Sequence, residues 1–136
     1  MVRPIMRDML FLSQASTPAT PSDAAVITDL KDTLRAHAEG CVGMAANMIG
    51  VHRRIIIVAM GPTALVLVNP VITEKRGLYE AEEGCLSLSG TRRTKRYRDI
   101  EVTYQDEAFQ PRRQAFSGFA AQIIQHEIDH CDGKLI

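Results

Sequence analysis

The stretch Gln125-His126-Glu127-Ile128-Asp129-His130 lies near the end of the 136-residue chain and decides how the rest must fold. Histidines four residues apart share one face of a helix, so His126 and His130 can bind one metal ion. Glu127 stands beside the first histidine, where it can reach a water on the metal without binding the metal itself. The stretch therefore predicts a C-terminal helix that carries a metal centre.

A third protein ligand is expected upstream of this helix. After His130, only Cys131 and Asp132 could supply a ligand before the chain ends, and both are too close to fold back comfortably. The best candidate is Cys85 in the segment Glu83-Gly84-Cys85-Leu86-Ser87, because a flanking glycine lets backbone approach a metal closely. One Cys and two His leave a fourth position for water, which is typical of a catalytic metal site.

Strands are expected in the middle of the chain. The β-branched runs 54–60 and 64–68 predict a hairpin of buried strands, with Asn69-Pro70 closing the second. Apolar and polar residues alternate over 100–105, as in a strand with one wet face, and 113–116 is a short partner.

Helices are expected on either side of these strands. Residues 13–22 form an exposed loop, after which Ser22 or Asp23 caps a helix that runs to about Ala38. The last helix should begin after Ser117 and end near Gly133. The pattern predicts an α+β fold, with small antiparallel sheets around the C-terminal metal-binding helix and the first helix outside.

Composition restricts the class of protein. The length fits one domain, residues 1–136, and 46% hydrophobic content suffices for one core. Sixteen basic and sixteen acidic residues cancel, so no global charge attracts nucleic acid or membrane, and no apolar run approaches a membrane span. Three cysteines at unrelated spacings fit a reducing compartment better than a disulfide framework. We therefore expect a cytoplasmic protein.

A basic segment, residues 92–98, holds five positive charges in seven residues. It invites a nucleic-acid or ribosome interpretation, but we favour a solvated loop for all but Arg92. Its charges would be balanced by the nearby acids Glu80, Glu82 and Glu83.

Three motifs in order resemble the peptide deformylases, which remove the formyl group from the N-terminal formylmethionine of new bacterial polypeptides. They are Gly-x-Ala-Ala at Gly43–Ala46, Glu-Gly-Cys-Leu-Ser at 83–87 and Gln-His-Glu-x-Asp-His at 125–130. The order of three separate motifs makes the resemblance specific, whereas His-Glu-x-x-His alone arises by chance on ordinary helices.

The resemblance implies a role for each matching residue. Cys85, His126 and His130 would hold one divalent metal, Fe²⁺ in most of the family, with Zn²⁺, Ni²⁺ or Co²⁺ able to replace it. Glu127 would serve as general base and then general acid. The Leu86 backbone N–H would donate to the oxyanion. The formylated nascent peptide would be the partner, with transient proximity to the ribosome, and the positions matching the substrate-binding residues are Val42, Gly43, Arg92 and Ile128.

The first motif departs from the family pattern Gly-x-Gly-x-Ala-Ala-x-Gln at two positions. Cys41 replaces the first glycine, and Met48 replaces the glutamine, whose side chain donates a hydrogen bond to the oxyanion. A thioether cannot donate. Losing one such donor lowers turnover about a hundred- to a thousandfold. We therefore expect a weakened oxyanion hole, with Asn47 or a water near Met48 as conceivable replacements.

Two further interpretations stay open at this point. One is a metallohydrolase that acts on another acyl-amide substrate. The other is a catalytically weak or silent homologue that binds metal or formylated N-termini. Asp129 likewise has two interpretations, as an acceptor that orients a ligand imidazole or as a solvated carboxylate.

Overall fold

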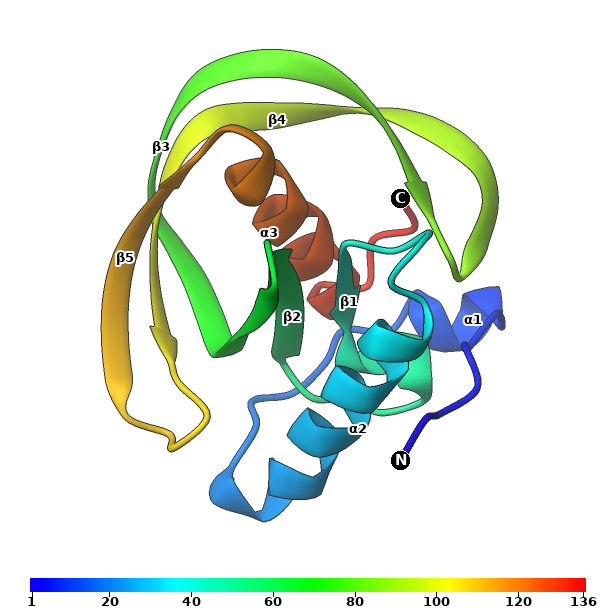
Figure 1. Cartoon of the computed structure of the whole chain (residues 1–136). Coiled ribbons are helices and arrows are strands. Elements are labelled where there is room, and N and C mark those ends of the chain that lie inside the picture. Colours follow the sequence, from blue (N-terminus) through cyan, green and yellow to red (C-terminus); the bar gives the residue numbers. More distant parts are fainter.

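A computed structural model describes all 136 residues and has one antiparallel sheet that curves around the C-terminal helix (Figure 1). In chain order the elements are α1 (Met9–Leu12), the 3₁₀ helix η1 (Pro21–Asp23), α2 (Ala24–Ala36), β1 (Gly43–Ala45), the 3₁₀ helix η2 (Ala46–Ile49), β2 (Ile55–Met60), β3 (Thr63–Cys85), β4 (Leu88–Gln105), β5 (Pro111–Ser117) and α3 (Gly118–Cys131). The predicted α+β class is confirmed.

The strands form a single sheet in the order β1-β2-β3-β4-β5, and every neighbouring pair is antiparallel. Figure 1 shows β3 and β4 arching over α3 as one long hairpin, so that the helix lies inside the curve of the sheet. This arrangement brings the end of β3 back over the helix that carries the histidines.

The prediction that the second strand ends at Asn69-Pro70 is wrong. β3 does not end at Asn69-Pro70 but continues to Cys85. The ladder is irregular between Val68 and Val71, where Asn69 has a positive φ of 51°. A bulge leaves a residue unpaired, so Pro70 can lie in the strand although it has no N–H to donate.

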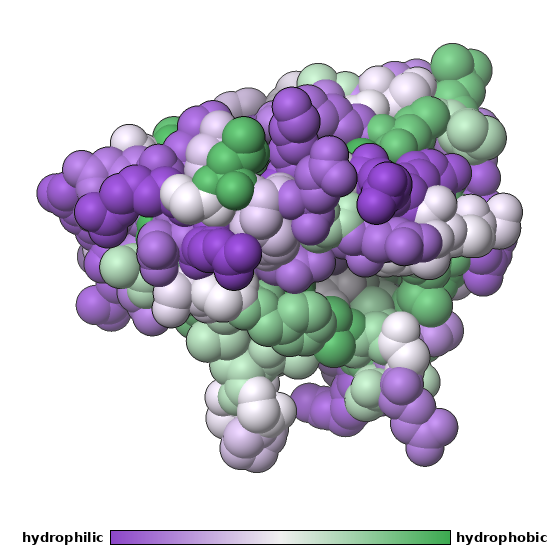
Figure 2. All heavy atoms as spheres, turned by 90° about the horizontal axis from the view of Figure 1, so that it is seen from above, coloured by the Kyte–Doolittle hydropathy of each residue, from purple (hydrophilic) through white to green (hydrophobic).

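The basic segment 92–98 is part of β4 and not a loop. Its strand character is hard to detect because five of its seven residues are positively charged, in place of the alternating apolar residues of an ordinary strand. Opposite charges face each other across the hairpin, and the register pairs Glu80 with Lys95 and Glu82 with Arg93. The face seen in Figure 2 is mostly hydrophilic, with apolar groups in small separate areas.

The core has two parts, and β2 contributes to both. Ile56 and Val58 belong to the cluster that includes residues of α3, whereas Ile55 and Ile57 belong to the cluster that includes residues of α2. Successive strand residues point to opposite faces, which explains the division. α2 packs outside the sheet, as expected, with buried Ile27, Leu30 and Leu34.

The bounds of α3 agree closely with the prediction. Ser117 is its extended N-cap, and Gly133 follows the C-cap with φ of 79°. A Cβ at Gly133 would lie 2.5 Å from the Ser13 carbonyl oxygen. Glycine is therefore needed there for both backbone conformation and close packing. None of the helices combines the length and apolar character required to cross a membrane.

Candidate active site

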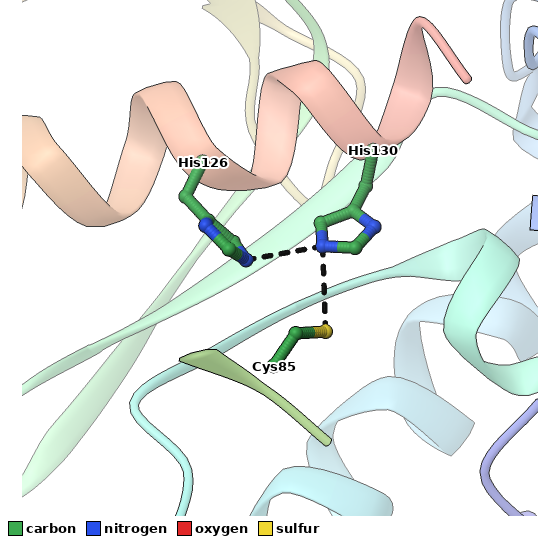
Figure 3. A group of neighbouring side chains, drawn as sticks. All are labelled: Cys85, His126 and His130. Carbon is green, nitrogen blue, oxygen red and sulfur yellow. Dashed lines mark hydrogen bonds between the residues drawn. The ribbon is translucent and has the colours of Figure 1, made fainter. Parts of the chain in front are cut away.

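Cys85, His126 and His130 form the one cluster of side chains suited to hold a metal ion (Figure 3). His130 Nε2 lies 3.0 Å from His126 Nε2 and 3.4 Å from Cys85 Sγ. A tetrahedral ion with metal–nitrogen bonds of about 2.1 Å and a metal–sulfur bond of about 2.3 Å would hold these atoms about 3.4 to 3.6 Å apart. One thiol and two imidazoles at these separations fit a divalent transition metal.

The fold explains why three residues from distant parts of the sequence meet. Cys85 ends β3, directly before the turn of Leu86 and Ser87 that leads into β4. His126 and His130 lie on α3 under this end of the hairpin, and in Figure 3 both imidazoles point from the helix toward the cysteine. The site therefore needs the long hairpin to curve back over the helix.

Glu83 orients His126, the first histidine of the candidate metal cluster. It lies two residues before Cys85, so both side chains project from the same face of β3. Glu83 Oε1 is 2.8 Å from His126 Nδ1, which leaves Nε2 directed at the other ligands. A carboxylate on the far nitrogen fixes the tautomer and ring orientation of a metal-ligating histidine.

Arg96 neutralises this buried carboxylate. Its guanidinium bonds both oxygens of Glu83, at 2.7 Å to Oε1 and 3.0 Å to Oε2, and Nη1 donates to Asp129 Oδ2 at 2.6 Å. Glu83 and Arg96 are both almost fully buried. The prediction that Arg96 lies in a solvated loop is wrong. Asp129 acts on Arg96 and has no hydrogen bond to a ligand imidazole.

The electrostatics of Glu83 follow from these contacts. Burial by itself raises the pKa of Glu83, but hydrogen bonds with His126 and Arg96 outweigh it and lower the pKa to about 2. The carboxylate is therefore ionised throughout the neutral range and serves as a hydrogen-bond acceptor.

Glu127 has the surroundings of a group that exchanges protons. It is 4% exposed, and its Oε1 has no hydrogen-bond partner in the protein. Burial raises the pKa of Glu127 to about 7. A pKa near neutrality suits a group that first accepts and later returns a proton.

A cavity of about 480 Å³ opens beside the metal-binding cluster. Two of the predicted ligands and Glu127 line it together with apolar side chains from several elements. The lining residues are Gly40, Cys41, Val42, Gly43, Met48, Glu82, Glu83, Gly84, Cys85, Leu86, Leu88, Gly90, Phe119, Gln122, Ile123, His126 and Glu127. A small molecule or the first residue of a peptide can therefore approach Glu127 and the ligands from one side.

The four predicted substrate-binding residues divide into two pairs. Val42 and Gly43 line the cavity, whereas Arg92 and Ile128 do not. Ile128 follows His126 by two residues, which turns it about 200° around the helix, into the core. The cavity lining therefore gives no support to a substrate-binding role for Ile128. Arg92 lies on β4 opposite Glu83, with a buried Nη1 that has no partner.

The cavity wall has no side-chain donor at the position of Met48, where an oxyanion donor is expected. Met48 lines the wall, 1% exposed, and its sulfur accepts from the Ala45 N–H at 3.5 Å. Asn47 does not replace the missing group, because it lies outside the lining and its Nδ2 donates to the His130 carbonyl oxygen at 2.9 Å. Leu86 remains the expected backbone donor on this wall.

Comparison with known proteins shows the family of the chain. The chain matches the polypeptide deformylase family over residues 5–136. It is 56% identical to a peptide deformylase of Clostridium beijerinckii over the full length of both, and 38% identical over 113 residues to peptide deformylase 3 of Shewanella oneidensis, covering 80% and 69% of the two chains.

Solved structures give the same result. The Met-Ala-Ser-bound class I type b peptide deformylase of Acinetobacter baumannii superposes with a TM-score of 0.89 at 28% identity, covering 99% of this chain and 97% of the other. The enzyme of Thermus thermophilus has a TM-score of 0.86 at 37% identity, covering 98% and 83%. The chain therefore belongs to the polypeptide deformylase family.

Proposed function

We propose that the cavity beside Cys85, His126 and His130 is the active site, with these residues as metal ligands and Glu127 as the proton-transferring group. The family consists of metallohydrolases that remove the N-formyl group from formylmethionine on new polypeptides, and this chain shares that activity. One observation carries the assignment of the site. A buried carboxylate with an unpartnered oxygen borders the same cavity as the metal-binding cluster.

The residues divide the chemistry between them. When bound, the divalent metal activates a water as nucleophile and polarises the formyl oxygen. Glu127 takes the proton of the attacking water and gives it to the leaving amine, a use for which its pKa of about 7 is suited. The Leu86 N–H donates to the charge that develops on the formyl oxygen. Glu83 and Arg96 hold the His126 ring in its ligating orientation.

The metal is proposed to be Fe²⁺, with Zn²⁺ or Ni²⁺ as substitutes. A mixed thiolate and imidazole set is compatible with several first-row metals, so the ligands narrow the choice without fixing it. The substrate is proposed to be a formylated nascent peptide in the cytoplasm, met close to the ribosome. Val42 and Gly43 are proposed to border the bound peptide, and Arg92 to contact its main chain.

We further propose that Met48 weakens catalysis. The thioether lies in the wall where the family places a side-chain donor, and Asn47 is engaged with His130. Met48→Gln should then raise kcat, up to about a hundredfold if the new amide reaches the oxyanion, with a smaller effect on KM. An unchanged kcat in a correctly folded variant would show that Met48 does not lower the activity.

The site assignment is tested with the Fe²⁺-loaded protein and formyl-Met-Ala-Ser. Wild type should bind one metal per chain and deformylate the peptide. Glu127→Ala should retain the metal and lose measurable turnover, whereas Glu107→Gln on an exposed loop should keep both. If metal-loaded wild type shows no turnover even at high enzyme concentration, the silent-homologue interpretation holds instead.

A further inference from the structure

One wall of the cavity carries a polar side chain that the reaction proposed above does not use. Gln122 lines the cavity from α3, one helical turn before His126 and on the same side as Phe119 and Ile123. Apart from His126, it bears the only side-chain N–H groups among the lining residues. The cavity therefore has an apolar wall that carries one side-chain amide.

Two hydrogen bonds fix the orientation of the Gln122 amide. Its Nε2 donates to Glu83 Oε2 at 3.0 Å, and the Tyr79 hydroxyl donates to its Oε1 at 3.2 Å. Both Glu83 oxygens already accept from Arg96, and the Tyr79 hydroxyl donates to the oxygen end of the amide, so the nitrogen end faces Glu83. The amide cannot flip by 180° without breaking both hydrogen bonds.

This orientation leaves one hydrogen of Gln122 unused. A primary amide nitrogen carries two hydrogens, and Glu83 takes one of them. No other group of the chain accepts from Gln122 Nε2, and the residue borders the cavity. The remaining N–H is therefore available to a ligand that places an acceptor against this part of the wall.

We propose that Gln122 determines specificity for the substrate's first residue by donating this N–H to its thioether sulfur. This inference rests on the function proposed above. Methionine is unbranched and flexible, and its sulfur is a weak acceptor. The apolar surface of Phe119, Ile123 and Leu88 would bind its methylene and methyl groups. The substrate class is then an N-formyl residue with an unbranched side chain that carries an acceptor near its end.

Norleucine provides the discriminating comparison, because it replaces the sulfur by a methylene in a chain of the same number of atoms. A methylene is the more apolar group, so a purely apolar cavity gives no advantage to methionine. A preference for methionine over norleucine therefore reports a polar contact with the sulfur.

The experiment compares kcat/KM of the Fe²⁺-loaded enzyme for formyl-Met-Ala-Ser and formyl-Nle-Ala-Ser. Wild type should favour methionine about two- to tenfold, the range expected of one neutral hydrogen bond. Gln122→Leu should bring the ratio to about one or below. Phe119→Leu alters the apolar wall but keeps the amide, so it should lower both values while preserving the ratio.

Equal wild-type values overturn the proposal, and so does a methionine preference that survives in Gln122→Leu. A second measurement needs no variant. The products Met-Ala-Ser and Nle-Ala-Ser are titrated into the wild-type metalloenzyme, and the methionine product should bind several-fold more tightly; equal affinities overturn the proposal. If wild type turns over neither formyl peptide, the proposed function fails, while the product titration still decides the role of Gln122.

Discussion

Arg7 Nη1 donates to the Leu86 carbonyl oxygen at 2.7 Å, so the N-terminal segment is bonded to the turn that carries the expected oxyanion donor. Met6, the residue before Arg7, makes a similar hydrogen bond: its N–H donates to the Met48 carbonyl oxygen at 2.7 Å. Two adjacent residues are thus bonded to the two chain segments that bring Met48 and Leu86 to the cavity.

Removing the Arg7 side chain should loosen the Leu86 turn. In Arg7→Ala we expect kcat for formyl-Met-Ala-Ser to fall about two- to tenfold, the range of one lost hydrogen bond, with KM little changed because the oxyanion forms only in the transition state. Arg7→Lys retains a donor and should recover part of the loss. Arg3→Ala, which removes a different N-terminal pair with Asp29, should leave kcat unchanged. An Arg7→Ala enzyme with wild-type kcat would contradict this role.

Arg96 should be the most important charged residue for stability. Arg96→Met removes the guanidinium that balances the buried Glu83 carboxylate and leaves only the His126 imidazole beside it, and breaking such a buried pair typically costs about 3–5 kcal/mol. Urea unfolding of the metal-free protein measures the change. Arg93→Met, on the exposed face of the same strand, should change the free energy of unfolding by less than about 0.5 kcal/mol. A similar effect of the two substitutions would refute the structural role of the buried pair.

How far the sequence could predict this site depends on which interactions are local. His126, Glu127 and His130 follow from helical spacing alone, and Cys85 from its flanking glycine and its place in the motif. The position of Glu83 beside Cys85 could be predicted as well, because residues two apart on a strand share a face. The sequence pattern ends the strand at Asn69-Pro70, however, and so gives Glu83 no strand whose face could be defined.

Arg96 could not be found in the same way. Its partners Glu83 and Asp129 come from β3 and α3, and only the register of the long hairpin brings the three together. That register depends on the irregular ladder between Val68 and Val71 and on pairs of opposite charge, neither of which produces a hydrophobic period. Local patterns therefore predicted the residues of the candidate metal cluster, while the network that holds them required the tertiary structure.

The Glu83 contacts also predict a pH dependence of stability. The folded-state pKa of Glu83 is lowered to about 2 from its ordinary value of 4.5. Its stabilisation is therefore fully present above pH 4.5 and is lost as the pH falls from about 4.5 toward 2. Thermal unfolding of the metal-free protein should show a steeper loss of Tm over this window in wild type than in Glu83→Gln. Parallel curves for the two proteins would exclude Glu83 as the source.

Removing the metal should lower the stability of the whole domain, since the three predicted ligands join the β3–β4 hairpin to α3. A ligand that binds only the folded state stabilises it by about 2.7 kcal/mol at a hundredfold excess over its Kd. Tm should therefore rise when metal is added back to chelated wild type. His130→Ala should lose most of this rise, because one ligand is gone. An equal rise in the two proteins would place the metal elsewhere.

Gly43 offers the sharpest test of how Glu127 is held. A Cβ at this position would lie 2.6 Å from Ile123 Cγ2 and 3.1 Å from Glu127 Oε2, so Gly43→Ala must displace one or both side chains. Misplacing a proton-transferring group by about 1 Å lowers turnover on the order of a hundredfold. Gly40→Ala is a matched control in the same cavity wall, because its Cβ would meet no atom within 4 Å. We expect Gly43→Ala to bind metal and lose most of its kcat, with Gly40→Ala close to wild type. Equal activities would mean that the Glu127 carboxylate tolerates displacement and does not act from the position seen here.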